Sequence, residues 1–354
     1  GNDIQLSASK IEDFGKCRFS YFCKYGLGAR RLDKVDFDPL TRGNIVHYAL
    51  EQFVNAHIDD IGTTDPAAIP DEVSAICDGY LVYIGAGKES LDDRFFYMIT
   101  AIKRTVTYVC TALNNEFAQS KFRPRFCELK VGKGEAVEPV TVKSDNGCNV
   151  HIKGSIDRVD TSPDGSVRVV DYKTGHKSFD LSDLLDGMNM QMLIYLYTII
   201  KNGRELLGAD RPAGVLYMRA ARNTDTGDKR YIKMDGILDD DREVVRSMEA
   251  DLGGKIVPAK INKKGTFDDY SKVISTDDFN TIFKYIDMTL ARLGSLISNG
   301  NISAVPLKNG GRTECEYCDY ASVCRKDDQN ICREHKDLKI CETVETMKEE
   351  LKEI

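Results

Sequence analysis

Two aspartates and a lysine, Asp157, Asp171 and Lys173, are spaced so that their side chains would meet on one face of a β-hairpin. Side chains alternate between the faces of a strand, so Asp171 and Lys173 share a face. Asp157 would join them from the neighbouring strand, with Cβ atoms roughly 4.5–5.5 Å apart. Two like charges at this separation destabilise a sheet unless a cation lies between them. The trio therefore predicts a Mg²⁺ site, with a lysine that positions water or stabilises charge on a phosphate.

The register of this hairpin depends on its turn. The turn sequence SPDG begins at Ser162 and predicts a three-residue loop whose glycine is left-handed. In that register Asp157 lies opposite Asp171, and Ser155 lies opposite Lys173. A slip of one residue would move these side chains to the other face of the sheet. The alternative interpretation is an edge hairpin whose charged side chains are simply solvated.

The sequence around these residues resembles the signature of the PD-(D/E)xK nuclease superfamily. Asp157 lies in GSIDRVD, while Asp171, Tyr172 and Lys173 lie in VVDYKTG, and both segments are most similar to the RecB-like branch. The resemblance implies an α/β fold with a restriction-endonuclease-like core, in which helices flank a mixed central sheet. It also implies metal-dependent hydrolysis of phosphodiester bonds in DNA.

Residues outside the hairpin match the same branch. Its upstream helix carries a histidine, which corresponds to His47 in GNIVHYALEQF. Its helix after the lysine strand carries Gln and Tyr, which correspond to Gln191 and Tyr195 in QMLIYLY, one turn apart on one helix face. The resemblance implies that Gln191 and Tyr195 support the site or hold the DNA strand. Glu128 is a weaker candidate, because an exposed glutamate on a strand is common.

The resemblance also implies roles around the metal ion. Asp157, Asp171 and the backbone carbonyl of Tyr172 would bind Mg²⁺ or Mn²⁺. Lys173 would orient the attacking water and stabilise the charged transition state. His47 would be an additional metal ligand, and its imidazole suits Mn²⁺ better than Mg²⁺.

Cysteines form a second group of candidate ligands. Of eleven cysteines, Cys315, Cys318 and Cys324 are bunched, which indicates metal ligands or free thiols in a chain without a secretion signal. The spacing leaves a zinc ion and a [4Fe–4S] cluster open and favours the cluster, because structural zinc sites usually use two close pairs. The set resembles the iron–sulfur-containing nuclease domain of AddB-type subunits. That resemblance implies a [4Fe–4S] cluster with Cys17 as its fourth ligand, which would clasp the two ends of the domain.

The resemblance to AddB-type domains extends from residue 5 to about residue 326. It implies a DNA exonuclease within a bacterial AddAB-type helicase–nuclease that acts in double-strand break repair and recombination. The expected partners are DNA, as single-stranded ends, and an AddA-type helicase–nuclease subunit. Three alternatives stay open: a CRISPR-associated RecB-like exonuclease, a catalytically silent DNA-end-binding module stabilised by the cluster, and a zinc-stapled interaction domain.

Composition and charge exclude several other classes of protein. The 354 residues are 42% hydrophobic and 30% charged, which is an ordinary globular balance. The net charge of −7 argues against a general polycation that coats nucleic acid. No Walker A motif is present, so we expect no ATP hydrolysis. The longest apolar run, Met192–Ile200, is far shorter than the roughly 20 residues of a membrane span, and without a signal peptide we expect a cytoplasmic location. The missing initial methionine suggests a piece of a longer protein.

The residue patterns predict one nuclease domain, 1–354, built from consecutive segments. Helices are expected at 5–27, 40–58, 71–83, 91–119, 181–201, 239–252 and 277–298, and strands at 126–132, 137–143, 149–160, 166–173, 213–219 and 229–233. The expected parts are a mainly helical part at 1–120, a catalytic α/β core at 121–235, a second helical part at 236–311, a cysteine segment at 312–326 and a charged tail at 327–354. This order places an α/β core between helical parts from both ends of the chain.

Overall fold

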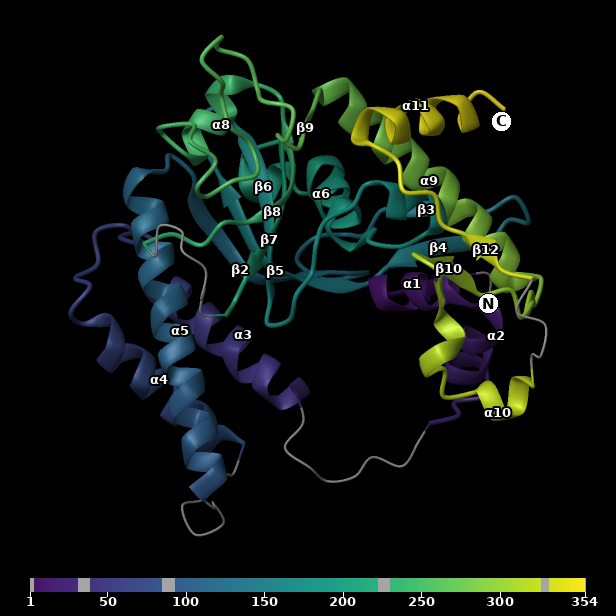
Figure 1. Ribbon diagram of the computed structural model, residues 1–354, viewed down its shortest axis with the longest axis horizontal. Coiled ribbons are helices and arrows are strands. Elements are labelled where there is room, and N and C mark those ends of the chain that lie inside the picture. The colour runs from purple at the N-terminus through teal and green to yellow at the C-terminus, as the bar shows by residue number, and fades with distance from the viewer. Residues whose placement is uncertain (1–2, 31–38, 85–92, 222–229, 326–330, 354) are drawn as a thin grey trace.

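A six-stranded mixed sheet forms the centre of the computed structural model, which describes residues 3–30, 39–84, 93–221, 230–325 and 331–353 (Figure 1). In sheet order the strands are β2 (Arg123–Val131), β5 (Gly154–Thr161), β6 (Ser166–Lys173), β7 (Arg211–Arg219), β8 (Asp235–Asp239) and β9 (Val273–Ile274). The pairs β6–β7 and β8–β9 are parallel, and the other neighbours are antiparallel. The expected α/β class with a mixed central sheet is confirmed.

Helices cover both faces of this sheet. One face packs against α3 (Pro39–Ala56), α4 (Ile69–Tyr83), α5 (Asp93–Gln119) and α8 (Arg242–Met248), and the other against α6 (Gln191–Asn202) and α9 (Thr276–Ser298). Strand β6 shows the division, because Val169 belongs to the α6 side and Val170 to the α3 side. Both are fully buried, as expected for a central strand with parallel pairing on one side.

A second, smaller sheet differs from the expected pattern. It has the order β1 (Asp3–Leu6), β4 (Asn149–Ile152) and β3 (Thr141–Lys143), with β1 parallel to β4. The expected strand 149–160 is therefore two strands in two sheets, which separate at Lys153. The expected first helix is α1 (Ala8–Lys16), α2 (Arg18–Tyr21) and the π-helix η1 (Phe22–Gly26), with Ser7 as the N-cap of α1.

Two other expected elements are shifted or divided. The predicted helix 181–201 is the short 3₁₀ helix η3 (Ser182–Asp186) followed by α6, because Gly187 and Asn189 have φ of +77° and +53°. Such left-handed residues end a helix. The predicted strand 229–233 was wrong, since the strand that pairs with β7 is β8, which begins at Asp235.

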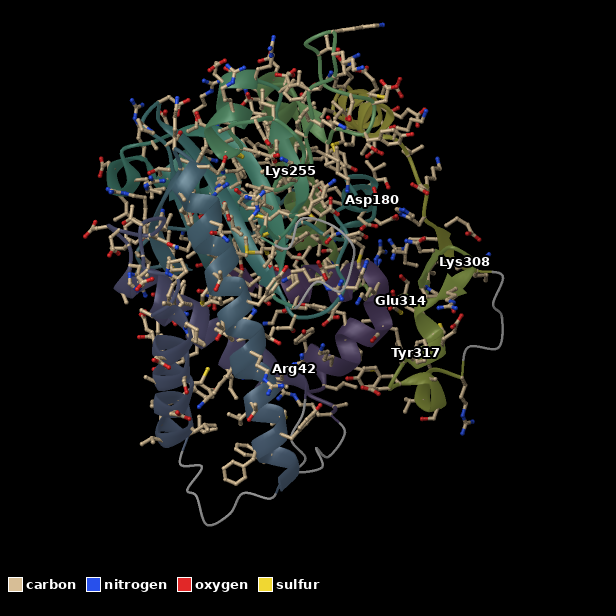
Figure 2. All side chains as sticks on the ribbon, turned by 60° about the vertical axis from the view of Figure 1, so that its left-hand side comes forward. Arg42, Asp180, Lys255, Lys308, Glu314 and Tyr317 are labelled. Atoms are coloured by element: carbon tan, nitrogen blue, oxygen red, sulfur yellow. The ribbon has the colours of Figure 1, made fainter. Side chains whose placement is uncertain are left out.

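The C-terminal segment lies against the first helices of the chain. It contains β10 (Leu307–Asn309), β11 (Arg312–Thr313), η4 (Glu314–Tyr317), α10 (Ala321–Cys324), β12 (Arg333–Glu334) and α11 (Ile340–Glu350). Figure 2 shows Glu314 and Tyr317 on this segment, next to the N-terminal helices. The Tyr320 hydroxyl donates a hydrogen bond to the Ala29 carbonyl at 2.8 Å, and the Arg333 guanidinium donates one to the Gly15 carbonyl. The two ends of the chain are thus joined directly.

The last helix, α11, lies in the part expected to be a charged tail. Its Val344 and Met347 side chains are buried in the core on the α9 side of the main sheet. Lys348 of α11 also pairs with Asp278 of α9 at 3.0 Å. Among the helices that the structure describes, none is both long enough and apolar enough to cross a membrane.

Candidate functional site

The β5–β6 hairpin has the register that its turn sequence predicts. The backbone N–H of Ser162 donates to the Ser166 carbonyl at 2.9 Å, and Gly165 has a φ of +82°. The strands then pair continuously as far as Arg158 and Val170. This pairing places Asp157 and Asp171 as the next two residues, on facing strands.

The backbone ladder of the hairpin ends just before these two aspartates. Asp157 Oδ2 accepts a hydrogen bond from the backbone N–H of Tyr172 at 2.7 Å, so a side chain bonds this amide. The expected pair of Ser155 with Lys173 is not formed, because the pairing of β5 with β6 ends at Arg158 and Val170. The carboxyl end of β6 is therefore free of β5 at the position where the lysine lies.

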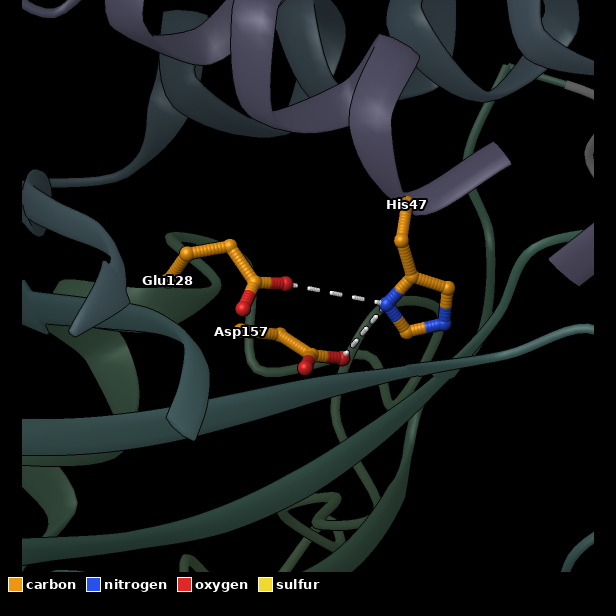
Figure 3. Close-up of side chains that lie close together, drawn as sticks. All are labelled: His47, Glu128 and Asp157. Carbon is orange, nitrogen blue, oxygen red and sulfur yellow. Dashed lines mark ion pairs between the residues drawn. The ribbon is translucent and has the colours of Figure 1, made fainter. Parts of the chain in front are cut away.

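Three side chains from separate elements converge at this end of the sheet (Figure 3). The His47 Nδ1 atom of α3 lies 3.3 Å from Asp157 Oδ2 of β5 and 4.0 Å from Glu128 Oε1 of β2. One ligand atom from each of the three lies within 4.8 Å of the others. An imidazole and two carboxylates are a donor set that suits Mn²⁺ or Mg²⁺. The structure thus brings together two predicted ligands and Glu128, which was only a weak candidate.

The backbone at Glu128 is distorted in a way that serves this convergence. Its φ is +50°, which is uncommon for a residue with a side chain. The residues on either side, Cys127 and Leu129, keep their pairs with β5, but Glu128 and the opposite Asp157 form no pair. The Glu128 carboxylate accepts a hydrogen bond from the Ser155 hydroxyl at 2.7 Å, which fixes its direction.

Asp171 and Lys173 form an ion pair beside this trio. The Lys173 Nζ atom lies 2.5 Å from Asp171 Oδ2, and Asp171 is 3% exposed. Burial, and then the negative charge of Asp157, raise the pKa of Asp171 to about 6, although Lys173 and His47 oppose the rise. A further cation nearby would stabilise the ionised form of this carboxyl group.

The same carboxylates change the pKa of His47. Burial lowers its pKa, but the hydrogen bond to Asp157 and the charges of Asp157, Asp171 and Glu128 together outweigh burial, so the pKa is raised. The imidazole ring also meets the Tyr172 ring edge to face, with centroids 6.2 Å apart. Without a metal ion, the neighbouring carboxylates therefore favour the protonated form of His47.

Gln191 and Tyr195 approach the site from the opposite face of the sheet. Both lie on α6, and the Tyr195 ring packs so closely on Gly154 that a Cβ there would lie 2.0 Å from the tyrosine hydroxyl. Burial raises the pKa of Tyr195 to about 12, which a hydrogen bond from Gln191 opposes and the charges of Asp171 and Asp157 reinforce. The hydroxyl therefore stays protonated and can donate a hydrogen bond near the carboxylates.

A buried charge network supports the middle residue of the DYK motif. Arg158 donates to Asp160 at 2.9 Å and, through Nη1, to the Tyr172 hydroxyl at 2.7 Å. Arg168 donates to Asp160 at 2.8 Å and to Glu116 at 2.5 Å. Both arginines and Asp160 are fully buried. The network anchors the Tyr172 side chain, whose backbone N–H in turn binds Asp157.

The four predicted cysteine ligands line one cavity between the two ends of the chain. This cavity has a volume of about 710 Å³, and Cys17, Cys315, Cys318 and Cys324 all contribute to its wall. Burial, and then the charges of Cys318, Cys324 and Cys17, raise the pKa of the neighbouring Cys23 thiol. The four thiols that the resemblance implies as ligands therefore border the same cavity.

The spacing of these sulfur atoms bears on the type of centre. A zinc ion bonded to four sulfurs at about 2.3 Å would hold the sulfurs about 3.8 Å apart. Among the cysteines that the structure describes, no three sulfur atoms lie within 4.8 Å of one another. The four thiols border one cavity, and their arrangement without a ligand leaves both types of centre open.

Comparison with known proteins gives one family and a consistent set of relatives. Residues 5–325 match the model of the PD-(D/E)XK nuclease superfamily. Similar proteins, each named as a subunit of an ATP-dependent helicase/deoxyribonuclease, occur in Thermoanaerobacter sp. (strain X514), with 28% identity over 92% of this chain, and Clostridioides difficile (strain 630), with 28% over 91%. The protein of that name from Ruminiclostridium cellulolyticum is 30% identical over 92% of this chain. The chain spans 30% of the length of each of these relatives.

Proposed function

Because the chain belongs to the PD-(D/E)XK nuclease superfamily, we propose that it cleaves DNA with a divalent metal ion held by His47, Asp157 and Asp171. The observation that carries this proposal is the convergence of the His47, Glu128 and Asp157 ligand atoms beside the Asp171–Lys173 pair. The Tyr172 carbonyl would complete the ligand set, and Glu128 joins it as a further carboxylate. A bound cation would polarise the phosphate and lower the pKa of an attacking water.

The residues of the chain would divide the remaining work. Lys173, whose ammonium group ends a flexible side chain, would orient the water and stabilise charge on the phosphate. The charge of Asp171 keeps the Lys173 ammonium in place through their 2.5 Å contact. Tyr195, held on α6 with Gln191, would donate to the strand or to a ligand carboxylate, since its hydroxyl stays protonated.

The substrate and setting follow from the relatives rather than from the site. Their shared name describes a helicase/deoxyribonuclease subunit, which supports a deoxyribonuclease within an AddAB-type complex. As the sequence resemblance implies, we further propose an exonuclease that acts on single-stranded DNA ends with an AddA-type partner. We propose this role in double-strand break repair, in the cytoplasm. The same name disfavours a CRISPR-associated exonuclease, and the intact DYK motif disfavours a silent DNA-end-binding module.

Cleavage of end-labelled single-stranded DNA tests this function. We expect cutting with Mg²⁺ or Mn²⁺ and none with EDTA. Lys173→Met keeps the aliphatic stem but removes the ammonium group, so it should slow cleavage by about 10²–10³-fold, as loss of one transition-state donor does. Lys153→Met, an exposed lysine between β4 and β5, is the matched control and should cut normally. Cutting that persists in EDTA, or an unaffected Lys173→Met variant, would refute the proposal.

We also propose that Cys17, Cys315, Cys318 and Cys324 hold a [4Fe–4S] cluster. Support comes from the cavity that all four cysteines line and from the irregular spacing of Cys315, Cys318 and Cys324 in the sequence. The cluster would clasp α1 and α2 to the C-terminal segment, and so close the ends of one nuclease domain. Closing so long a loop removes conformational freedom from the unfolded chain.

Substitution of one cluster cysteine tests the clasp. Cys318→Ala should abolish iron content and visible absorbance and lower the thermal midpoint, because the N-terminal helices lose their covalent link to the other end. Cys341→Ala, an exposed cysteine on α11, is the matched control and should change neither property. The measurements are anaerobic iron and zinc analysis, an absorbance spectrum and a melting curve. Zinc in place of iron, or an unchanged spectrum in Cys318→Ala, would overturn the cluster assignment.

A further inference from the structure

A cavity of about 400 Å³ beside the carboxyl end of β7 takes no part in the chemistry proposed above. Its wall includes the cations Arg219, Lys233, Lys260 and Lys272 and the aromatic side chain of Tyr270. We propose that this cavity binds a single DNA strand next to the phosphate that is cleaved, with the phosphates on the cations and a base on Tyr270. The inference rests on the proposed function, because it extends the substrate contacts of the same site.

The cavity lies beside the candidate active site, at the carboxyl ends of the neighbouring strands β6 and β7. Arg219, in its wall, pairs in parallel register with Lys173, and the Ala220 N–H donates to the Lys173 carbonyl at 2.9 Å. Paired residues on neighbouring strands present their side chains to the same face, and the strands lie about 4.8 Å apart. Lys173 on β6 and Arg219 on β7 therefore lie on neighbouring strands. A DNA strand with a phosphate at Lys173 needs to span only the distance between these two strands to reach Arg219.

Three of the cations are exposed, namely Arg219, Lys233 and Lys260. None of them forms an ion pair with any residue in the described ranges. Unpaired cations grouped around one hollow repel one another, so an anion that enters the hollow is stabilised. The protein as a whole has a net charge of −7, so a group of cations around one cavity contrasts with the charge of the whole chain.

The carboxylates in the same wall are already occupied. Asp235 lies 2.6 Å from Lys272 and also accepts the N–H of Phe179 at 2.8 Å. Asp268 accepts hydrogen bonds from the Ser271 hydroxyl at 2.8 Å and from the Tyr270 N–H at 3.2 Å. These bonds orient the two carboxylates, and the wall keeps an excess of cations, four against two.

The exposed ring of Tyr270 favours a nucleic acid strand over a simple anion as the ligand of this cavity. Its side chain is 92% exposed, although an exposed tyrosine loses hydrophobic stabilisation. Apolar side chains of Ile232, Met234 and Ala259 line the same hollow. An aromatic ring beside free cations is the combination by which proteins bind single strands, with bases on the ring and phosphates on the cations. A paired base in a duplex cannot stack on this ring.

Binding of labelled DNA by the intact chain in EDTA tests the charge contribution without cleavage. The lining variant is Arg219→Ala, Lys233→Ala and Lys260→Ala together. The control variant is Lys143→Ala, Lys284→Ala and Lys352→Ala, three exposed lysines on β3, on α9 and just after α11, none of which lines the cavity. Both variants lose the same net charge. The probe is a fluorescent single strand of about 12 nucleotides, and the dissociation constant is measured against salt concentration.

The lining variant should lose phosphate contacts that the control keeps. For single strands each contact contributes about 0.7 to the slope of log affinity against log salt, so the slope should become shallower by about 2. The control should keep the wild-type slope. Equal slopes for the two variants would overturn the inference, whether or not the wild type cleaves DNA. A difference in slope, together with no metal-dependent cleavage by the wild type, would instead overturn the proposed function alone.

A second pair of variants tests the stacking contact. Tyr270→Ala should weaken single-strand binding by about tenfold, whereas Tyr270→Phe keeps the ring and should bind like the wild type. Tyr83→Ala, which removes an 81%-exposed tyrosine at the end of α4, is the control. Binding of the matching duplex should not change in Tyr270→Ala. Equal weakening for single strand and duplex, or equal loss in Tyr270→Phe, would contradict the assigned role of the ring.

Discussion

Asp171→Asn is expected to abolish DNA cleavage and, in the metal-free protein, to raise the free energy of unfolding above pH 6. Cleavage should fall by at least about a thousandfold, because a metal ligand is lost and the cation supplies several kcal/mol to the transition state. Stability should rise because the wild-type carboxyl group, 3% exposed, has its pKa raised from 3.8 to about 6 by burial and by Asp157. Asparagine has nearly the same shape as aspartate but no charge, so the variant avoids the cost of burying an ionised carboxylate.

The direction of this effect with pH follows from proton binding. Between pH 3.8 and about 6 the folded protein binds the Asp171 proton and the unfolded chain releases it. Its contribution to stability is therefore present at low pH and is lost as the pH rises through about 6. A pKa raised from 3.8 to about 6 corresponds to roughly 3 kcal/mol, by which the ionised carboxylate destabilises the metal-free fold at neutral pH.

Urea unfolding in EDTA at pH 5 and pH 7.5, with cleavage assays beside it, measures both effects. The advantage of Asp171→Asn over the wild type should be larger at pH 7.5, and added Mg²⁺ should stabilise the wild type more than the variant. Asp59→Asn, at an exposed aspartate in the turn after α3, is the control and should change neither cleavage nor stability. A variant that is less stable than the wild type in EDTA would show that Asp171 serves the fold rather than the metal.

The hairpin was predictable because its information is local. The turn SPDG determines the loop, the loop determines the register, and the register carries Asp157 to Asp171. The end of the ladder was not predictable, because it depends on a hydrogen bond between the Asp157 side chain and the Tyr172 backbone. The alternation of side chains along a strand predicts regular backbone pairing. It does not predict a hydrogen bond from a backbone amide to a side chain.

Glu128 shows which part of the site depends on tertiary structure. Residues 132–153 separate β2 from β5 and include the strands of another sheet, so no turn rule relates Glu128 to Asp157. The left-handed backbone at Glu128 adds a local exception that residue propensity does not anticipate. By contrast, family resemblance located His47, since its helix can be recognised without knowledge of its packing. The fold then placed the His47 Nδ1 atom 3.3 Å from Oδ2 of the predicted ligand Asp157.

Asp160→Asn is expected to destabilise the protein by about 3–5 kcal/mol, the cost of removing one partner from a buried ion pair. Asp160 is the shared acceptor of Arg158 Nε and Arg168 Nε, at 2.9 and 2.8 Å, and all three side chains are fully buried. An asparagine keeps the shape but removes the charge and turns an N–H₂ group toward a guanidinium. Glu116 alone would then face two buried cations.

The matched control is Glu345→Gln, which weakens an exposed pair with Lys348 on α11. An exposed pair contributes at most about 1 kcal/mol, so this variant should unfold almost like the wild type. Urea unfolding of the metal-free proteins at pH 7.5 compares the two changes. If Asp160→Asn lowered the free energy of unfolding no more than Glu345→Gln does, the buried ion pairs would not stabilise the hairpin.

The same variant separates support of the fold from support of the site. Arg158 also donates to the Tyr172 hydroxyl at 2.7 Å, and the Tyr172 N–H binds Asp157, so loss of Asp160 should loosen the backbone that carries the proposed metal ligands. Cleavage by Asp160→Asn, assayed well below its thermal midpoint, should therefore require more Mg²⁺ for half-maximal rate. An unchanged Mg²⁺ requirement with reduced stability would confine the network to the fold. A rise in the Mg²⁺ requirement together with reduced stability would connect the buried arginines to the metal site through Tyr172.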